Sequence, residues 1–461
     1  MTTDAMDEAV EATPATADDI IDRTDTYCVV GAGSSGLTAG KNLLEYGHFV
    51  DIIEREDDVG GNWNFGKPNS RVYESTHTIS SKPFTQYPDF PMPDRFPDYP
   101  HHTEIYEYLS DYADHFGLRE RIEFETAVAE VEPYHGGDCW DVTLESADGN
   151  RQTRRYGGLV IANGHNWYPK LPDVPGEFDG EVIHAADYDS ADQLTDRRVL
   201  VVGAGNTGCD IAVEAAQSAE VCYHSTRRAY WYAPKYTMGK PSDQIYDMML
   251  SLGLPTRVLQ FLLEGTSKLT TGDMERFGLP EPDHHFLETH PIVNSLLIYY
   301  VGHGEIVPKP DIERFDGNQV RFADGSSVDV DLVVHATGYL IRFPFIDREH
   351  LNWRRGRPQL SLNVFHPNYD NLFVIGLIQP DSGQFKLVHW QAVAVAKLLR
   401  LRDQDPSRLQ PFMDRFTRSC DEQLSAGVDY KESTRHYVEV QHMSYIRKLS
   451  NLIEDLEDAL Q

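Results

Sequence analysis

Two glycine-rich loops are the segments of this sequence best suited to bind a ligand. They read GAGSSG at residues 31–36 and GAGNTG at residues 203–208. In a G-x-G-x-x-G loop the glycines permit a tight turn and a close backbone approach to a pyrophosphate, and the helix after the loop points its N-terminus at the negative charge. We therefore predict two dinucleotide sites. The residues expected at the phosphates are Gly31, Gly33, Ser35 and Gly36 in the first loop, and Gly203, Gly205, Asn206, Thr207 and Gly208 in the second.

The residue types after each loop distinguish the two ligands. Glu54 stands 18 residues after Gly36, close to the roughly 20 residues expected for an acid that binds ribose hydroxyls. Its carboxylate would repel a 2′-phosphate. Arg227 stands 19 residues after Gly208 and is followed by Arg228, and guanidinium groups bind a phosphate bidentately. We therefore predict FAD at the first loop and NADPH, in preference to NADH, at the second. Solvated surface charges are the alternative interpretation of the two arginines.

Strand and helix patterns surround both loops in the order that would position them. An apolar run at residues 26–30 precedes the first loop, a helical pattern follows it to residue 44, and a second strand is expected at 48–53. The second loop repeats this strand-turn-helix-strand order. The other expected elements are strands at 198–202, 220–224, 329–335 and 371–375, helices to about 216 and at 389–400, and a proline- and aromatic-rich loop at 79–101.

The two repeated units predict an α/β fold with two Rossmann-type dinucleotide-binding domains, the NADPH-binding domain being inserted in the FAD-binding domain. Residues 1–24 are acidic and aperiodic, so we expect a disordered tail there. We assign residues 25–165 and 330–461 to the FAD-binding domain. Residues 166–329 form the expected NADPH-binding domain, with a helical insertion at about 245–303.

The overall charge excludes some classes of partner. The chain has 73 acidic and 41 basic residues and a formal net charge of −32, so its surface would repel nucleic acid and anionic membranes. No stretch reaches the roughly 18 apolar residues of a membrane span, and the N-terminus lacks the basic and apolar regions of a signal peptide. We expect a cytoplasmic protein. The Asp-rich, Lys-poor composition resembles that of salt-loving organisms, in which salt screens self-repulsion; an ordinary acidic protein is the alternative.

The cysteines argue against two kinds of chemistry. They are scattered, with no C-x-x-C pair and no metal-ligand spacing. We therefore expect no metal site and no dithiol mechanism, and a reducing compartment. The five are Cys28, Cys139, Cys209, Cys222 and Cys420.

A further pattern lies directly before the second loop. It reads Phe178-x-Gly180-x-x-x-His184-x-x-x-Tyr188, and with it the chain resembles the flavin-containing monooxygenase family, the class B flavoprotein monooxygenases. The likeness extends over roughly residues 25–400. The other segments that support it are Gly60-Gly61-Asn62-Trp63, Ser81-Lys82 with Asp89-Phe90-Pro91, Ala336-Thr337-Gly338-Tyr339, Gly376 to Pro380 with Gln379, and the helix at Gln391-Ala392.

The resemblance implies a reaction and its partners. NADPH reduces FAD, the reduced flavin binds O2 as a C4a-hydroperoxide, and one oxygen atom passes to a soft nucleophile, nitrogen or sulfur, of a small-molecule substrate. The protein supplies a dry cavity and hydrogen bonds. Homodimers are plausible for the family. We place Arg55, Asn62, Trp63 and Gln379 beside Glu54 at the FAD, and we expect His184 to be a hydrogen-bonded hinge rather than an acid.

Two alternatives stay open. Baeyer–Villiger monooxygenases, which insert oxygen beside a ketone, usually end the same pattern in Trp-Pro or Trp-Asp, whereas this chain has Tyr188-Asp189. The other alternative is an oxidase or redox sensor that binds FAD and NADP without productive oxygenation. The family usually has an Asn, whose amide reaches the reactive flavin edge, where this chain has Ile79. Because isoleucine offers no hydrogen bond, the next residue, Ser80, is the candidate polar contact.

Overall fold

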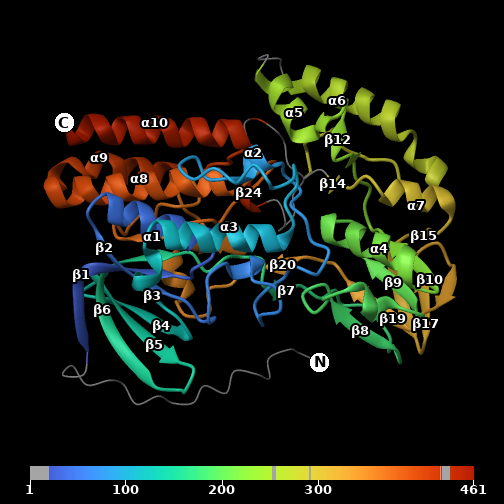
Figure 1. Cartoon of the computed structure of the whole chain (residues 1–461), viewed down its shortest axis with the longest axis horizontal. Helices are drawn as coiled ribbons and strands as arrows, with labels where there is room; N and C mark the ends of the chain where they lie inside the picture. Colours follow the sequence, from blue (N-terminus) through green and yellow to red (C-terminus); the bar gives the residue numbers. More distant parts are fainter. Residues whose placement is uncertain (1–19, 252–255, 290–291, 426, 428–436) are drawn as a thin grey trace.

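The computed structural model describes residues 20–251, 256–289, 292–425, 427 and 437–461. Two separate β-sheets lie at opposite ends of the long axis, and helices lie against both of them (Figure 1). The fold is α/β with two Rossmann-type units, which confirms the fold class predicted from the repeated loops.

The first sheet contains the strands on either side of the first glycine loop. Its order is β3-β2-β1-β6-β5-β4, and β23 also pairs with β6. The strands β3, β2, β1, β6 and β23 are parallel, whereas β4, β5 and β6 form an antiparallel edge. Residues 27–30 of β1 are apolar and buried, as expected for a strand inside a parallel sheet. The bounds are β1 (Ile21–Val30), β2 (Phe49–Ile53), β3 (Ile122–Glu123), β4 (Thr126–Tyr134), β5 (Cys139–Ser146), β6 (Arg151–Ile161) and β23 (Leu372–Val374).

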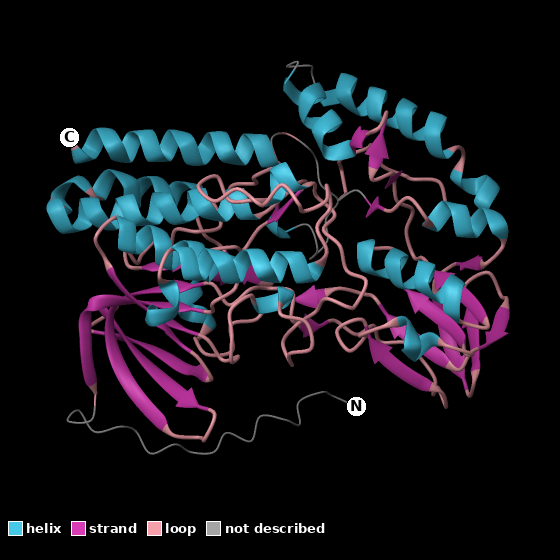
Figure 2. Ribbon diagram, in the orientation of Figure 1, coloured by secondary structure: helices cyan, strands magenta, loops and turns pink. Residues whose placement is uncertain are grey.

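A layer of helices covers this first sheet (Figure 2). Among them, α8 contacts both α1 and α10. Fourteen of its 20 residues are buried, so this helix lies inside the layer and not on its outer surface. The helix predicted at 389–400 is therefore confirmed and extends further at both ends. The bounds are α1 (Ser34–Glu45), α3 (His102–His115), α8 (Phe385–Gln404), α9 (Gln410–Ser419) and α10 (His442–Leu460).

The second sheet contains the strands on either side of the second loop. Its order is β15-β10-β9-β19-β8, and every pairing is parallel. Helix α4 begins in the second loop and packs against β9 and β10. The bounds are β8 (Glu181–His184), β9 (Arg198–Val202), α4 (Asn206–Ser218), β10 (Val221–Ser225), β15 (Ile306–Lys309) and β19 (Leu332–His335).

The chain crosses between the two sheets at two adjacent places. The outward crossing contains β7 (Tyr168–Pro169) and the return crossing contains β20 (Tyr339–Leu340), and these short strands pair antiparallel. They lie in the middle of the molecule between the two sheets (Figure 1). The second sheet is thus built from a segment inserted between two parts of the first.

Three expected boundaries need correction. Strand β1 begins at Ile21, so the last four residues of the expected 1–24 tail belong to a strand that pairs with β6; residues 1–19 lie outside the described residues. Strand β19 pairs with β8 and β9, so the expected boundary at residue 330 is too early. The region 245–303 is only partly helical, because residues 278–289 and 292–296 are not helical. Its helices are α5 (Ser242–Ser251), α6 (Thr256–Thr271) and α7 (Leu297–His303).

Among the helices described, none is both long and apolar enough to cross a membrane.

Candidate functional site

The first glycine loop makes a turn that requires glycine. Gly31 has φ +100°, and its N–H donates to the Ile53 carbonyl oxygen at 2.8 Å. A Cβ on Gly31 would lie 2.9 Å from the Ala162 carbonyl oxygen, and a Cβ on Gly36 would lie 1.8 Å from the Gly31 carbonyl oxygen. Gly33 is the N-cap of α1, so no side chain at that position covers the first-turn N–H groups, which lack acceptors inside the helix. The loop therefore fits a pyrophosphate.

The second loop repeats this geometry. Gly203 has φ +117°, and its N–H donates to the Ser225 carbonyl oxygen at 3.0 Å. A Cβ on Gly203 would lie 2.4 Å from the Ala336 carbonyl oxygen, and a Cβ on Gly208 would lie 2.0 Å from the Gly203 carbonyl oxygen. Gly205 is the N-cap of α4. The second loop therefore fits a pyrophosphate for the same reasons as the first.

Not every polar side chain predicted at the loops is directed to a ligand. The Asn206 side-chain oxygen accepts the Val293 N–H at 2.8 Å, so it holds a neighbouring segment of the protein. Ser35 is buried, and a Cβ on Gly376 would lie 2.2 Å from its hydroxyl oxygen. Thr207 is half-buried on the first turn of α4. These contacts leave the backbone N–H groups as the main phosphate-binding feature.

Glu54 lies beside the first loop at the end of β2. It is 6% exposed, and its two oxygens accept the Ala32 N–H at 2.6 Å and the Glu56 N–H at 3.0 Å. Burial raises the pKa of Glu54, and the two N–H donors act in the opposite direction. The carboxylate is therefore fixed next to the loop backbone, where an acceptor for ribose hydroxyls is needed.

The backbone register of the two loops shows which residues are equivalent. In the first loop the Gly31 N–H donates to the carbonyl oxygen of Ile53, and in the second the Gly203 N–H donates to that of Ser225. The residues that follow these two acceptors, Glu54 and Thr226, therefore occupy matching positions. Arg227 therefore corresponds to Arg55 and not to Glu54, and our count along the sequence was wrong by one residue. Thr226, which the sequence pattern did not single out, is the position equivalent to Glu54, and it also stands 18 residues after the last loop glycine.

The arginines after the two loops differ in their surroundings. Arg227 and Arg228 are exposed just beyond β10, and among the described residues neither forms an ion pair. Arg55 is also exposed, but its guanidinium lies over the Trp167 ring, 5.6 Å from the ring centroid. The side chains of Arg227 and Arg228 are thus available for an anionic ligand.

The segment predicted from Gly60 to Trp63 packs directly on the first loop. The Gly60 N–H donates to the Ala32 carbonyl oxygen at 3.1 Å, and a Cβ on Gly61 would lie 3.1 Å from the Gly33 Cα. Trp63 is partly buried against the core under the helices, which favours packing over stacking on a ligand. The structure thus packs Gly60 and Gly61 on the first loop, and Asn62 and Trp63 follow them in η2 (Gly61–Trp63).

Comparison with known proteins identifies the family of this chain. Residues 25–459 match the family model described as flavin-binding monooxygenase-like. The chain belongs to this family. It is 31% identical to flavin-containing monooxygenase 5 of Oryctolagus cuniculus, over 92% of this chain and 82% of that protein. The resemblance inferred from the motifs is thereby confirmed.

Two solved structures share the fold of this monooxygenase. One is the S-allyl-L-cysteine S-oxygenase from Allium sativum, with a TM-score of 0.67 and 21% identity, covering 95% of this chain and 89% of that one. The other is the open form of cyclohexanone monooxygenase, with a TM-score of 0.69 and 18% identity, covering 95% and 98%. The enzyme is an NADPH-dependent flavin monooxygenase, and FAD and NADPH are its cofactors, as predicted.

The pattern from Phe178 to Tyr188 is structural in this monooxygenase. The Ala186 N–H donates to Nδ1 of His184 at 3.0 Å, so Nε2 carries the proton and donates to the Gly338 carbonyl oxygen at 3.1 Å. Burial lowers the pKa of His184, which keeps the ring neutral. Phe178 packs on Phe315. His184 therefore ties the end of β8 to the return crossing through a hydrogen bond, which agrees with the expected structural role.

The loop that contains Ile79 and Ser80 lies between the first loop and α5. The Ser80 hydroxyl bonds to the Thr85 hydroxyl at 2.9 Å, so its partner is inside its own loop. Ile79 is 37% exposed and is not part of a core. The Ser81 N–H donates to Asp243 of α5 at 2.6 Å. The structure therefore gives Ser80 no contact with the described residues of either glycine loop.

Gln379 lies in β24 (Gln379–Pro380), which pairs with β25 (Glu439–Val440). Gly376, three residues earlier, contacts Ser35 of the first loop, so this strand follows a segment that packs on the first glycine loop.

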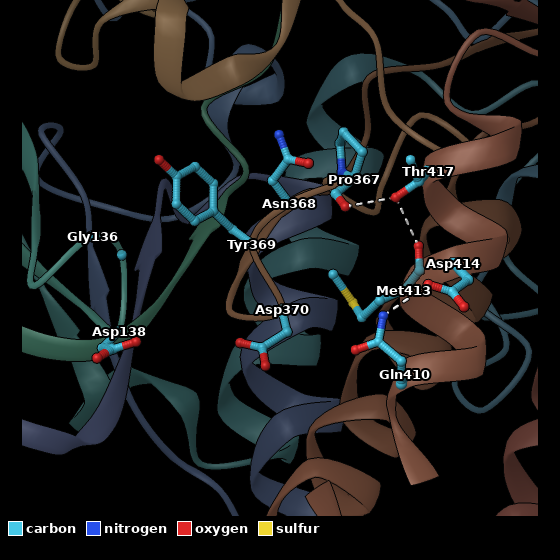
Figure 3. Close-up of a pocket in the computed structure, with 11 residues that line it drawn as sticks. Gly136, Asp138, Pro367, Asn368, Tyr369, Asp370, Gln410, Met413, Asp414 and Thr417 are labelled. Atoms are coloured by element: carbon cyan, nitrogen blue, oxygen red, sulfur yellow. Dashed lines mark hydrogen bonds between the residues drawn. The ribbon is translucent and has the colours of Figure 1, made fainter. Parts of the chain in front are cut away.

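A polar surface pocket lies elsewhere, between the β4–β5 turn, the segment 367–370 and α9 (Figure 3). Asp138, Asp370 and Asp414 line it, and the lining residues come from neither glycine loop. Within the described part of the chain no cluster of His, Cys, Asp or Glu has the arrangement of a metal site. We therefore assign this pocket no role in binding the two cofactors.

Proposed function

We propose that the first loop binds FAD, that the second binds NADPH, and that the enzyme transfers one oxygen atom from O2 to nitrogen or sulfur of a small molecule. The observation on which the cofactor assignment depends is the difference at the matched positions after the two loops. Glu54 offers an acceptor to ribose hydroxyls at the first, whereas Thr226 provides no carboxylate at the second. At the next position both units have an arginine, but Arg55 lies over the Trp167 ring, whereas the exposed Arg227 forms no ion pair among the described residues and its guanidinium can bind a 2′-phosphate.

The flavin supplies the redox chemistry and oxygen activation. The residues of this chain bind and orient. The loop backbones and the N-termini of α1 and α4 hold the pyrophosphates, and Glu54 and Arg227 select which nucleotide occupies each loop. His184 and the paired crossings keep the two units facing one another.

Two features support nitrogen or sulfur as the acceptor. The pattern before the second loop ends in Tyr188-Asp189 and lacks the tryptophan usual in Baeyer–Villiger enzymes. The structural neighbour from Allium sativum is named an S-oxygenase. The similarity to cyclohexanone monooxygenase keeps ketone oxidation as the second candidate.

The test is the fate of the oxygen. FAD-loaded enzyme receives NADPH and O2 with a tertiary amine, a dialkyl sulfide or a cyclic ketone, and NADPH consumption, oxygenated product and hydrogen peroxide are quantified together. We expect N-oxide or sulfoxide in proportion to the NADPH consumed. Lactone as the main product would establish the ketone reaction instead. Peroxide equal to the NADPH consumed, with no oxygenated product, would refute the proposal and indicate an oxidase or sensor.

A further inference from the structure

Helix α4, which begins in the second glycine loop, presents two acids one turn apart to a segment of the other unit. Asp210 accepts the Tyr73 hydroxyl at 2.8 Å, and Glu214 accepts the hydroxyl of Ser75. Residues at i and i+4 share a helix face, so the two acids receive nearby residues of one segment. Tyr188 also donates to Glu214.

The contact at Asp210 reaches the loop itself. The other oxygen of Asp210 accepts the Asn294 side-chain amide at 2.6 Å. The neighbouring residue, Val293, donates its N–H to Asn206, the first residue of α4. Tyr73 is 5% exposed and packs in the apolar core of the second sheet. The Tyr73 hydroxyl is therefore joined to the start of α4 through three hydrogen bonds, by way of Asp210 and the pair Val293–Asn294.

The same segment is anchored at its other end to the first loop. Tyr87 is fully buried, and its hydroxyl donates to the carbonyl oxygen of Ser34, the first residue of α1, at 2.6 Å. Its ring stacks on Phe385 of α8. Between the two ends, the Ser81 N–H donates to Asp243 at 2.6 Å. Residues 73–87, which we name the bridging segment, thus run from one nucleotide-binding helix to the other.

We infer that the bridging segment sets the position of the nicotinamide relative to the flavin, with Tyr73 and Asp210 as positioning residues for hydride transfer. The inference rests on the proposed placement of FAD and NADPH. Hydride transfer requires the reacting atoms about 3–3.5 Å apart, and a displacement of about 1 Å can cost on the order of 100-fold in rate. The Tyr73 hydroxyl ties the bridging segment to α4, and the Tyr87 hydroxyl ties it to α1, so loss of the Tyr73 contact would change this distance from outside both glycine loops.

The experiment compares Tyr73→Phe with Tyr300→Phe. Tyr300 accepts a hydrogen bond from Gln217 of α4 at 2.9 Å, so the control removes a hydroxyl from the same helix but from within the same unit. Flavin reduction is followed anaerobically by rapid mixing at saturating NADPH. We expect Tyr73→Phe to reduce at least about 10-fold more slowly, by the distance dependence of positioned reactions. Dithionite reduction and the Kd for NADP⁺ should stay near the wild-type values.

Hydrogen exchange supplies a readout besides activity. In Tyr73→Phe the amides of residues 73–81 and of the first turn of α4 should lose protection, whereas in Tyr300→Phe they should keep it. Asp210→Asn should also slow the reduction, since it weakens the contacts with both Tyr73 and Asn294. Adding Tyr73→Phe to Asp210→Asn should slow it little further, because the Tyr73–Asp210 contact is already weakened in the single variant. If Tyr73→Phe fails to fold, the exposed Ser75→Ala tests the neighbouring contact with Glu214.

The outcomes separate the two proposals. Wild-type enzyme that NADPH does not reduce would contradict the proposed function. Wild-type enzyme that NADPH reduces, together with Tyr73→Phe, Asp210→Asn and Ser75→Ala variants that reduce at the same rate and keep exchange protection, would overturn the positioning role alone.

Discussion

The two glycine loops resemble one another in shape and differ in the side chains that come after the second strand of each unit. In each loop, the first glycine has a positive φ and donates to the strand beyond the helix, and in each it packs on an alanine carbonyl, from Ala162 or from Ala336. The acid Glu54 has Thr226 as its counterpart. Because the two loop backbones have the same geometry, both fit a pyrophosphate equally well. On our proposal the choice of nucleotide therefore depends on one or two side chains after β2 and after β10.

The loops also differ in how the protein covers them. Gly60 and Gly61 pack on the first loop, Gly376 contacts Ser35, and Tyr87 bonds to Ser34. At the second loop, the Val293 N–H donates to the Asn206 side chain, and among the described residues the exposed Arg227 has no ring contact like that of Arg55 with Trp167. We expect the first ligand to remain bound through purification and the second to exchange with solvent, as a reductant that is consumed in each turnover must.

The largest effect should come from adding one methyl group to either loop. In Gly208→Ala the Cβ would lie 2.0 Å from the Gly203 carbonyl oxygen. We expect NADP⁺ affinity to fall on the order of 100-fold, since strain of about 3 kcal/mol corresponds to that factor, while FAD is retained. Gly36→Ala should do the reverse. Flavin content by absorbance and NADP⁺ binding by calorimetry check both. Loss of the same cofactor in both variants would contradict the assignment.

The next effect concerns Glu54. Replacing it by Gln removes the charge that accepts the ribose hydroxyls and weakens the bonds from the Ala32 and Glu56 N–H groups. We expect FAD to bind about 10- to 100-fold more weakly, because hydrogen bonds to a charged group contribute about 1.5–3 kcal/mol. Fluorescence titration of the apoprotein with FAD measures this. Asp57→Asn, at an exposed ion pair with Lys67, is the control and should bind FAD normally.

Arg227→Ala should weaken only one nicotinamide cofactor. We expect KM for NADPH to rise roughly 10-fold or more, since a charge-assisted phosphate contact is lost, and KM for NADH to stay unchanged. Steady-state kinetics with both reductants measures this. Arg197→Ala, at an exposed pair with Glu181, is the control. Equal changes for NADPH and NADH would refute the 2′-phosphate role of Arg227.

The sequence predicted the elements near each loop better than the contacts between the two units. Both loops and the strands that became β19 and β23 follow from local patterns of glycine and apolar residues. The equivalence of Thr226 and Glu54 depends on where β10 ends, which a count of residues does not reveal. The partner of Tyr73 is Asp210, 137 residues away, and nothing in either local pattern indicates the other. Strand β19 was assigned to the wrong unit because pairing partners are not a local property.

A separate effect concerns the dependence of the free energy of unfolding on pH. His165 lies shortly after the alanine behind the first loop and His335 precedes the alanine behind the second, and burial lowers the pKa of each to about 4. The unfolded chain, with a histidine pKa of about 6.5, takes up a proton that the folded chain does not. The free energy of unfolding is therefore at its full value above pH ~6.5. It falls on acidification toward pH ~4, by roughly 1.4 kcal/mol per pH unit for each such histidine.

Denaturant unfolding between pH 7 and pH 5 measures this slope. His335→Asn should make it shallower by about one proton, and replacing the exposed His303 by Gln should leave it unchanged. An unaltered slope in His335→Asn would show that His335 does not account for the acid sensitivity.

The most direct test of the difference between the loops is to place the acid of the first loop in the second. Thr226→Glu puts a carboxylate at the position equivalent to Glu54, and the ratio of kcat/KM for NADPH to that for NADH is measured in this variant and in the wild type. We predict that the ratio falls on the order of 100-fold, because a carboxylate beside a 2′-phosphate costs several kcal/mol. A ratio equal to that of the wild type, in an enzyme that still binds FAD and is still reduced, would contradict the assignment of NADPH to the second loop.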